Sequence, residues 1–242
     1  MNIVIPLVGE GKRFKEAGFK TPKPLIKVCG KTVLEHAVSS LGLDGNYMFV
    51  IRKTEYSDQI RDILLTLKPS CTIIETAELT EGSACSISLL RDFINNDQPL
   101  LTTNCDQVLK WNPKKFQKFC ETTTFDGVVA TYPFGDIKLN SKSPYSFVKL
   151  VDGCAVDFME KFAISEDALC GIHFWRKGKD FISSAQKMFE KNDRVNNEFY
   201  VSTAYKHFVE SGGKVTAFKL SEEQFYSLGT PEDLFLYEAP KT

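Results

Sequence analysis

The sequence predicts an α/β fold in which a mainly parallel, mixed sheet lies between helices. Through residues 1–105, short apolar runs alternate with stretches of helical period, and the apolar runs have no polar face. Such strands between amphipathic helices are typical of a parallel sheet covered on both sides. After residue 106 shorter β-type runs follow one another, which predicts a β-rich second part.

The elements of the first part follow in order. Helices are expected at residues 31–41, 56–67 and 83–94, where apolar residues recur with the helical period. The expected strands are residues 2–8, 46–51, 71–75 and 99–104. Ligand sites in such sheets lie beyond the carboxyl ends of the strands. The segments that follow residues 8 and 104 are therefore predicted to meet.

The second part is predicted to mix both element types. Asp152-Gly153 is a hairpin-turn signal between two of its strands, and Pro231 suits the first position of a closing helix. The expected strands are residues 127–134, 145–151, 154–160, 168–175 and 214–220, and the expected helices are residues 113–123, 179–191, 200–211 and 230–238. Because no linker separates the parts, we expect a single domain over residues 1–242, with parts of about 1–110 and 111–242.

Composition restricts the classes of partner. The net charge of −1 offers no general attraction to nucleic acid or membrane, and no apolar run approaches the ~20 residues of a membrane span. Seven widely spaced cysteines without a CxxC pair argue against disulfides and zinc and favour a cytoplasmic location. The first residues do not have the pattern of a signal peptide. A homo-oligomer is left open.

A glycine-rich segment follows the first strand. In "GEGKR" (residues 9–13) two glycines let backbone amides converge on an anion, and Arg13 adds a two-pronged donor for phosphate. A tight turn without function is the equally open alternative. A dinucleotide-binding fingerprint is excluded because Phe14 replaces its third glycine and because Pro22 and Pro24 oppose an early helix.

Lys23 stands between those two prolines. Stiff backbone on both sides reduces the entropy lost when the ammonium group is aimed at a ligand; a rigid surface bend is the alternative. Asp106 follows the strand expected at residues 99–104. From the residues alone, an N-cap for a helix in "DQVLKWNP" is the favoured interpretation of Asp106.

Residues 9–41, which contain these motifs, closely resemble the sugar-phosphate nucleotidyltransferases, or nucleotide-sugar pyrophosphorylases. The pattern of that family is GxGxR, PKPL and V-x-GK-x-(L/I)-E. The chain is most similar to short bacterial-type members that include cytidylyltransferases. The resemblance implies a Rossmann-like domain with a β-rich acceptor-binding lobe. It extends over "TEGSACSI" (80–87), "NCDQ" (104–107), "MEK" (159–161), "CGIHFW" (170–175), "NEFYVSTAY" (197–205) and "LGTPEDL" (228–234).

The resemblance implies a reaction between a nucleoside triphosphate and a small phosphorylated acceptor, with Mg²⁺ as cofactor and pyrophosphate as product. CTP is favoured, with UTP and dTTP as alternatives. Catalysis would rest on Arg13, which binds the departing phosphates, and on Lys23, which lies between the two reacting phosphates. The implied nucleotide-binding residues are Leu7, Gly9, Gly11, Arg13, Thr80, Gly82, Ser83, Asn104 and Asp106, the last also the metal ligand, and the implied acceptor-binding residues are Lys23, Glu160, Lys161, Gly171 and Glu198.

Several of these residues also have a purely structural explanation. Gly82-Ser83 also suits a simple helix start, and the charges at 160, 161 and 198 also suit a solvated surface. The family usually has a metal-binding Asp where this chain has Ser227. Phosphate and water would then complete the metal shell, or Glu198 or another acid would do so. Weak metal binding or an inactive chain is the other interpretation. The alternative functions are a GT-A-like glycosyltransferase, whose D-x-D motif is N-C-D here, and a non-catalytic nucleotide-binding module.

Overall fold

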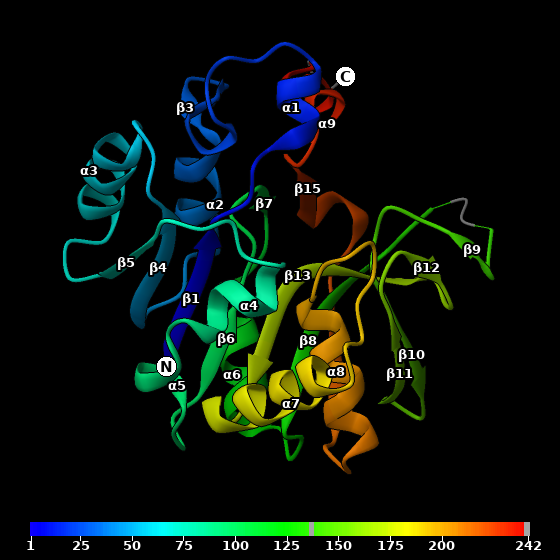
Figure 1. Cartoon of the computed structure of the whole chain (residues 1–242). Helices are drawn as coiled ribbons and strands as arrows, with labels where there is room; N and C mark the ends of the chain where they lie inside the picture. The colour runs from blue at the N-terminus through cyan, green and yellow to red at the C-terminus, as the bar shows by residue number, and fades with distance from the viewer. Residues whose placement is uncertain (136–137, 240–242) are drawn as a thin grey trace.

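The computed structural model describes residues 1–135 and 138–239. Within them a nine-stranded sheet has the order β11-β10-β13-β6-β1-β4-β5, and β8, paired with β13, carries β14 (Figure 1). Its strands are β1 (Asn2–Leu7), β4 (Asn46–Arg52), β5 (Thr72–Thr76), β6 (Leu100–Thr102), β8 (Gly127–Pro133), β10 (Phe147–Val151), β11 (Cys154–Met159), β13 (Asp167–Trp175) and β14 (Val215–Lys219). The predicted α/β fold with a mixed sheet is confirmed.

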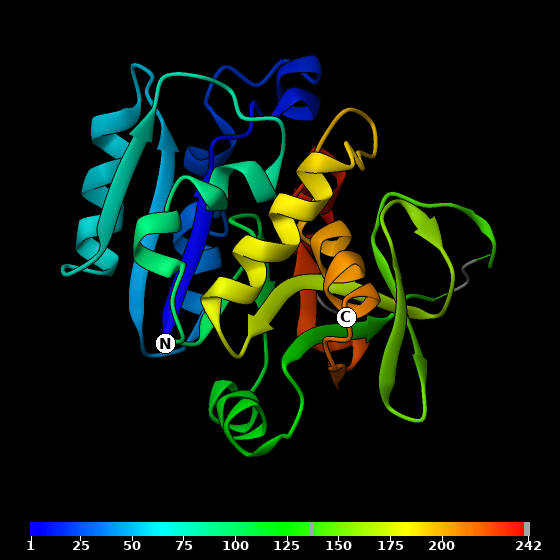
Figure 2. The same ribbon diagram turned by 60° about the horizontal axis from the view of Figure 1, so that its bottom comes forward.

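Helices cover both faces of this sheet, and two separate apolar clusters lie beneath them. One face carries α2 (Val33–Leu41), α3 (Ser57–Leu67) and α6 (Pro113–Thr122). The other carries α4 (Ser83–Ser88), α5 (Arg91–Ile94), α7 (Gly178–Glu190) and α8 (Val201–Glu210). Figure 2 shows α7 and α8, in yellow and orange, across that second face. In the described part of the chain, no helix is both long and apolar enough to span a membrane.

The first half of the sheet is parallel, as expected. β1 pairs in parallel with β4 and β6, and β4 pairs in parallel with β5. Ile3, Val4 and Ile5 are all 0% exposed, because helices bury the side chains that alternate to the two faces. The carboxyl ends of these strands therefore share one edge.

The second half is antiparallel around β13, which pairs with both β6 and β8. β10 and β11 form the predicted hairpin, with Asp152 and Gly153 in the left-handed region that such a two-residue turn requires. The helix expected at residues 83–94 divides into α4 and α5. Ser88 donates its hydroxyl to the Ala84 carbonyl in the last turn of α4, and this kind of bond favours a bend.

Several short elements were not predicted. Helix α1 (Lys12–Glu16) begins directly after Gly11, although the prolines were expected to oppose an early helix. It ends well before Pro22, so neither ring meets its hydrogen bonds. The other short elements are η1 (Lys23–Leu25), η2 (Glu222–Gln224) and the pairs β2 (Lys27–Val28) with β3 (Lys31–Thr32), β7 (Gln107–Leu109) with β15 (Phe225–Ser227) and β9 (Ser141–Lys142) with β12 (Phe162–Ala163), while α9 (Pro231–Glu238) is the predicted closing helix.

The buried His173 on β13 predicts a loss of stability in mild acid. Burial lowers the pKa of His173 to about 4, whereas an unfolded histidine titrates near 6.5. As the pH falls through this window the unfolded chain binds a proton that the folded chain refuses, so stability decreases. We expect His173 to lower the free energy of unfolding by about 2 kcal/mol between pH 7 and pH 5. His173→Phe should remove this part of the decrease, and urea unfolding of both proteins measures it. An equal pH dependence in both proteins would contradict this assignment.

Candidate active site

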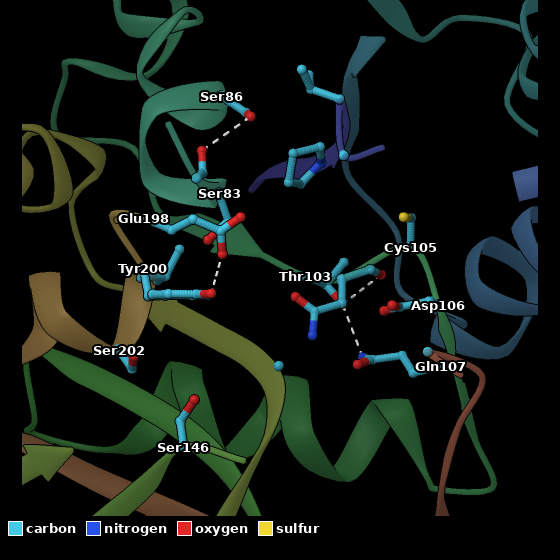
Figure 3. Close-up of a pocket in the computed structure, with 18 of the residues that line it drawn as sticks. Ser83, Ser86, Thr103, Cys105, Asp106, Gln107, Ser146, Glu198, Tyr200 and Ser202 are labelled. Atoms are coloured by element: carbon cyan, nitrogen blue, oxygen red, sulfur yellow. Dashed lines mark hydrogen bonds between the residues drawn. The ribbon is translucent and has the colours of Figure 1, made fainter. Parts of the chain in front are cut away.

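A cavity of about 510 Å³ opens at the carboxyl ends of the parallel strands. The loops after β1 and β6 both line it, as their strand positions predicted. Figure 3 shows Asp106 and Gln107 on one side, Glu198 and Tyr200 across from them, and Ser146 and Ser202 together at a third position. The two parts of the chain therefore enclose a single cavity.

All but one of the predicted site residues line this cavity. They are Gly9, Gly11, Arg13, Lys23, Thr80, Gly82, Ser83, Asn104, Asp106, Glu160, Lys161, Gly171 and Glu198. The exception is Leu7, which is 6% exposed and packs in the core below α2. Its neighbours Pro6 and Val8 line the cavity instead. Alternation along β1 explains this, because adjacent side chains point to opposite faces.

The glycine loop lies directly against the Pro-Lys-Pro bend. Gly11 adopts the left-handed conformation, and a Cβ there would come within 3.3 Å of the Lys23 Cβ. Glycine therefore suits position 11 for two reasons: the backbone is left-handed there, and a side chain would crowd Lys23. Pro22 and Pro24 hold Lys23 at the start of the 3-10 turn η1, where the Leu25 amide donates to the Pro22 carbonyl. The predicted stiffness around Lys23 is present.

Lys23 and Asp106 form an ion pair inside the cavity. The Lys23 Nζ lies 2.7 Å from the Asp106 Oδ2, and the two side chains are 19% and 23% exposed. Burial alone lowers the pKa of Lys23, but the charge of Asp106 and their hydrogen bond raise it above the usual lysine value. Lys23 is therefore a fixed cation. The helix N-cap interpretation of Asp106 is wrong, because strand β7 follows it and pairs with β15.

An acid that sequence analysis missed lies beside Asp106. A Cβ at Gly229 would come within 3.3 Å of both the Asp106 Oδ2 and the Ser227 Oγ, and within 3.8 Å of the Asp233 Oδ2. Ser227 donates its hydroxyl to Asp233 at 2.8 Å, and Asp233 also completes the capping box of α9 with Thr230. The capping-box spacing in "TPED" was the available signal, but it indicated only a helix start.

The candidate metal ligands around Asp106 suit Mg²⁺ only in part. All are oxygens, the ligands that Mg²⁺ prefers, but among the described residues no group of three or more His, Cys, Asp or Glu side chains is arranged to hold a metal. Mg²⁺ commonly uses one or two carboxylates and completes its shell with water and substrate phosphates. Asp106 therefore fits an ion that arrives with a triphosphate rather than one held by a preformed cage.

The opposite end of the cavity carries a second polar network. The buried Glu160 accepts hydrogen bonds from Ser202, at 2.6 Å, and from Ser146. Burial raises the pKa of Glu160, and these two hydroxyls lower it in part. Lys161 donates to the Tyr200 hydroxyl at 2.6 Å, and Tyr200 donates to Glu198 (Figure 3). The predicted acceptor residues at 160, 161 and 198 thus belong to ordered networks, although Glu198 itself is exposed.

Two glycines make room for the walls of the cavity. Gly82 lies in a backbone region that favours glycine, and a Cβ there would overlap the backbone of Phe199. It is also the N-cap of α4, so the helix-start interpretation is correct and Gly82 still lines the cavity. Gly171 has a φ of +76°, and a Cβ there would overlap the Asn104 amide and come within 2.9 Å of the Gln107 Oε1. Because Gly171 has no side chain, the amides of Asn104 and Gln107 both fit beside it.

Other cavity residues escaped sequence analysis. Gln107, Tyr145, Ser146, Tyr200 and Ser202 line the cavity, although none was predicted to do so. His173 was not predicted to belong to the site either, yet it also lines the cavity. The segment "CGIHFW" around it was noted for its family resemblance, but that resemblance implied a role only for Gly171.

Comparison with known proteins assigns this architecture. The family model for nucleotidyl transferase matches residues 4–239. A Vibrio cholerae RC9 nucleoside-diphosphate-sugar pyrophosphorylase is similar in structure, with a TM-score of 0.82, 20% identity and coverage of 98% of this chain and 99% of that one. An inositol-1-phosphate CTP transferase from T. maritima is similar with a TM-score of 0.77, 16% identity and coverage of 98% and 93%.

A curated relative agrees over a shorter span. The bifunctional protein GlmU of Methanocaldococcus jannaschii is 24% identical over 145 residues, which are 59% of this chain. The match covers 34% of that protein, so this chain aligns with about a third of its length. The family model spans nearly all of this chain, and the solved structures share its fold from end to end. The chain belongs to the nucleotidyl transferase family.

Proposed function

We propose that this chain transfers a nucleoside monophosphate from a nucleoside triphosphate to a small phosphorylated acceptor, with Mg²⁺ as cofactor. The observation that carries the proposal is the arrangement of charges in the cavity. The cations Arg13 and Lys23 and the carboxylate Asp106 stand at one end, and the Lys161–Tyr200–Glu198 network stands at the other. One cavity then has room for a triphosphate and an acceptor phosphate.

In the proposed reaction, an oxygen of the acceptor phosphate attacks the α-phosphorus of the triphosphate. The bond between the α-phosphorus and the oxygen bridging to the β-phosphorus breaks, and pyrophosphate leaves with that electron pair. The nucleophile is already an anion, so no strong base is needed. The barrier lies in bringing negative groups together, which favours catalysis by positioning and charge stabilisation.

Lys23 suits a place between the two reacting phosphates. It is charged, braced by two prolines and held by a single ion pair that a phosphate can replace. Arg13 lies on the glycine loop and suits the phosphates that depart. A bound Mg²⁺ would neutralise phosphate oxygens, and Asp106 is the residue that would hold it. Release of Asp106 from Lys23 would then free both groups for substrate.

CTP is the favoured triphosphate, with UTP and dTTP as alternatives. The support is the similarity to cytidylyltransferases and the T. maritima relative, which is described as a CTP transferase for inositol-1-phosphate. The test is pyrophosphate release from each of CTP, UTP, dTTP, ATP and GTP with a panel of sugar, polyol and amino-alcohol phosphates. Release of a nucleoside diphosphate from a nucleotide sugar would favour the glycosyltransferase alternative. Silence with every pair would favour a non-catalytic module.

Loss of the Lys23 charge should remove most of the activity while the fold remains. We expect Lys23→Met to lower kcat/KM by about 30- to 1000-fold, because a preorganised charge contributes about 2–4 kcal/mol to transition-state stabilisation. The matched control is Lys27→Met, which removes an exposed lysine on β2 outside the cavity. Near-normal pyrophosphate release from Lys23→Met, with thermal unfolding as the check of folding, would refute the proposed mechanism.

The absent second carboxylate predicts a gain of metal affinity. Ser227→Asp would add an acid beside Asp106 and Asp233, so we expect Mg²⁺ binding to tighten at least about tenfold, about 1.4 kcal/mol. Isothermal titration without nucleotide measures this directly. Ser227→Ala, which removes the hydroxyl without adding charge, should show no gain. Unchanged affinity in Ser227→Asp would place the metal away from this corner.

A further inference from the structure

Three buried polar atoms in the cavity have no hydrogen-bond partner among the described residues. They are the Thr102 Oγ1, the Gln107 Oε1 and the His173 Nε2. The residues that carry them are all among those that line the cavity, and they are 1%, 3% and 7% exposed. A buried polar group without a partner is costly, so three in one cavity point to a ligand that completes them.

The Gln107 atom is an acceptor. Gln107 donates its Nε2 to the Thr103 Oγ1 at 3.1 Å, while the Thr103 hydroxyl donates to the Asn104 carbonyl. Because the single Thr103 proton is already used, Thr103 can only accept from Gln107. This network fixes the orientation of the amide and leaves its oxygen to receive a proton donor.

The His173 atom is an acceptor as well. Burial lowers the pKa of His173 to about 4, so the ring is neutral at neutral pH. A hydrogen bond with the Gly171 backbone raises that pKa slightly, as expected for a ring N–H that donates to a carbonyl. The nitrogen without a partner, Nε2, therefore carries the lone pair. The Thr102 hydroxyl can either donate or accept a hydrogen bond.

These atoms share one region of the sheet, where β6 pairs with β13. Thr102 and His173 are opposite each other in the antiparallel pair of β6 and β13, so their side chains share a face. The Gln107 oxygen lies against Gly171, two residues along the same strand. His173 also packs against Tyr205 of α8, the helix whose Ser202 holds Glu160. His173 and Glu160 are therefore both held by residues of α8.

We propose that Thr102, Gln107 and His173 form a specificity subsite that recognises O–H or N–H donors on the carbon skeleton of the phosphorylated acceptor. The inference rests on the proposed function and names the acceptor class. Lone pairs repel a phosphate, so the subsite faces the other end of the acceptor. Hydroxylated or primary-amine phosphate esters fit it. A quaternary ammonium ester or a plain alkyl phosphate does not, because neither has a donor to offer.

The chain offers a matched pair of variants for the test. Thr102→Val and Thr131→Val each replace a buried hydroxyl that has no partner in the described part of the chain, but only Thr102 lines the cavity. We expect Thr102→Val, Gln107→Leu and His173→Phe each to lower kcat/KM for the acceptor at least tenfold while KM for the triphosphate stays unchanged. Thr131→Val should match the unmodified protein. Equal kinetics for all four variants would overturn the subsite.

Substrate pairs test the same point without mutation. Pyrophosphate release is compared for ethanolamine phosphate against choline phosphate, and for glycerol 1-phosphate against propyl phosphate. The member with donors should react at least tenfold faster in each pair that reacts at all. Turnover of choline phosphate or propyl phosphate at the rate of its partner would refute donor recognition.

Histidine NMR separates this proposal from the proposed function. In the free protein we expect His173 to be neutral at pH 6 with its proton on Nδ1, and its Nε2 resonance to move when glycerol 1-phosphate or glucose 1-phosphate is added. A proton on Nε2, or no shift with either ester, would overturn the subsite even if the enzyme is active. Absence of pyrophosphate release from every triphosphate and ester would instead overturn the proposed function, and the NMR result would still stand on its own.

Discussion

The ion pair between Lys23 and Asp106 is the interaction on which the cavity depends. It joins the bend that follows the glycine loop to the end of β6, two segments 83 residues apart in the chain. The pair lies in partly buried surroundings, where an uncompensated charge on either residue would be costly. Under the proposed function, the free protein would keep a cation and an anion in contact until substrates with matching charges arrive. The same pair would then serve both stability and phosphate binding.

Space for this arrangement is provided by residues that lack side chains. Gly11 lets the loop approach Lys23, Gly229 lets the turn before α9 approach Asp106, and Gly171 admits two amides beside β13. The contacts of Gly229 and Gly171 join segments far apart in sequence, whereas Gly11 approaches a residue of the same connecting segment. A Cβ at any of them would push a polar group out of the cavity wall or demand a shift of the backbone. The glycines therefore set the shape of the site as much as the charged residues set its chemistry.

Local patterns in the sequence were enough to predict the sheet, because apolar strands and helical periods are set by neighbouring residues. They also placed the glycine loop after residue 8 and Asp106 at one edge, since strand ends of a parallel sheet share that edge. Leu7 was misplaced because its position in the motif said nothing about which face of β1 it occupies. His173 and Asp233 were missed for a different reason. Their roles arise from contacts with strands and turns that lie far away in the chain, and one residue's spacing does not reveal such contacts.

Charge is distributed unevenly along the cavity, and this gives direction to whatever binds there. The glycine-loop end carries Arg13 and Lys23, which attract phosphate, whereas the floor at Gln107 and His173 presents lone pairs. A molecule with a phosphate at one end and proton donors at the other can satisfy both ends in only one orientation. That orientation directs its phosphate toward Lys23 and its carbon skeleton toward β13. Selection of the acceptor and alignment of the nucleophile would then follow from one set of contacts.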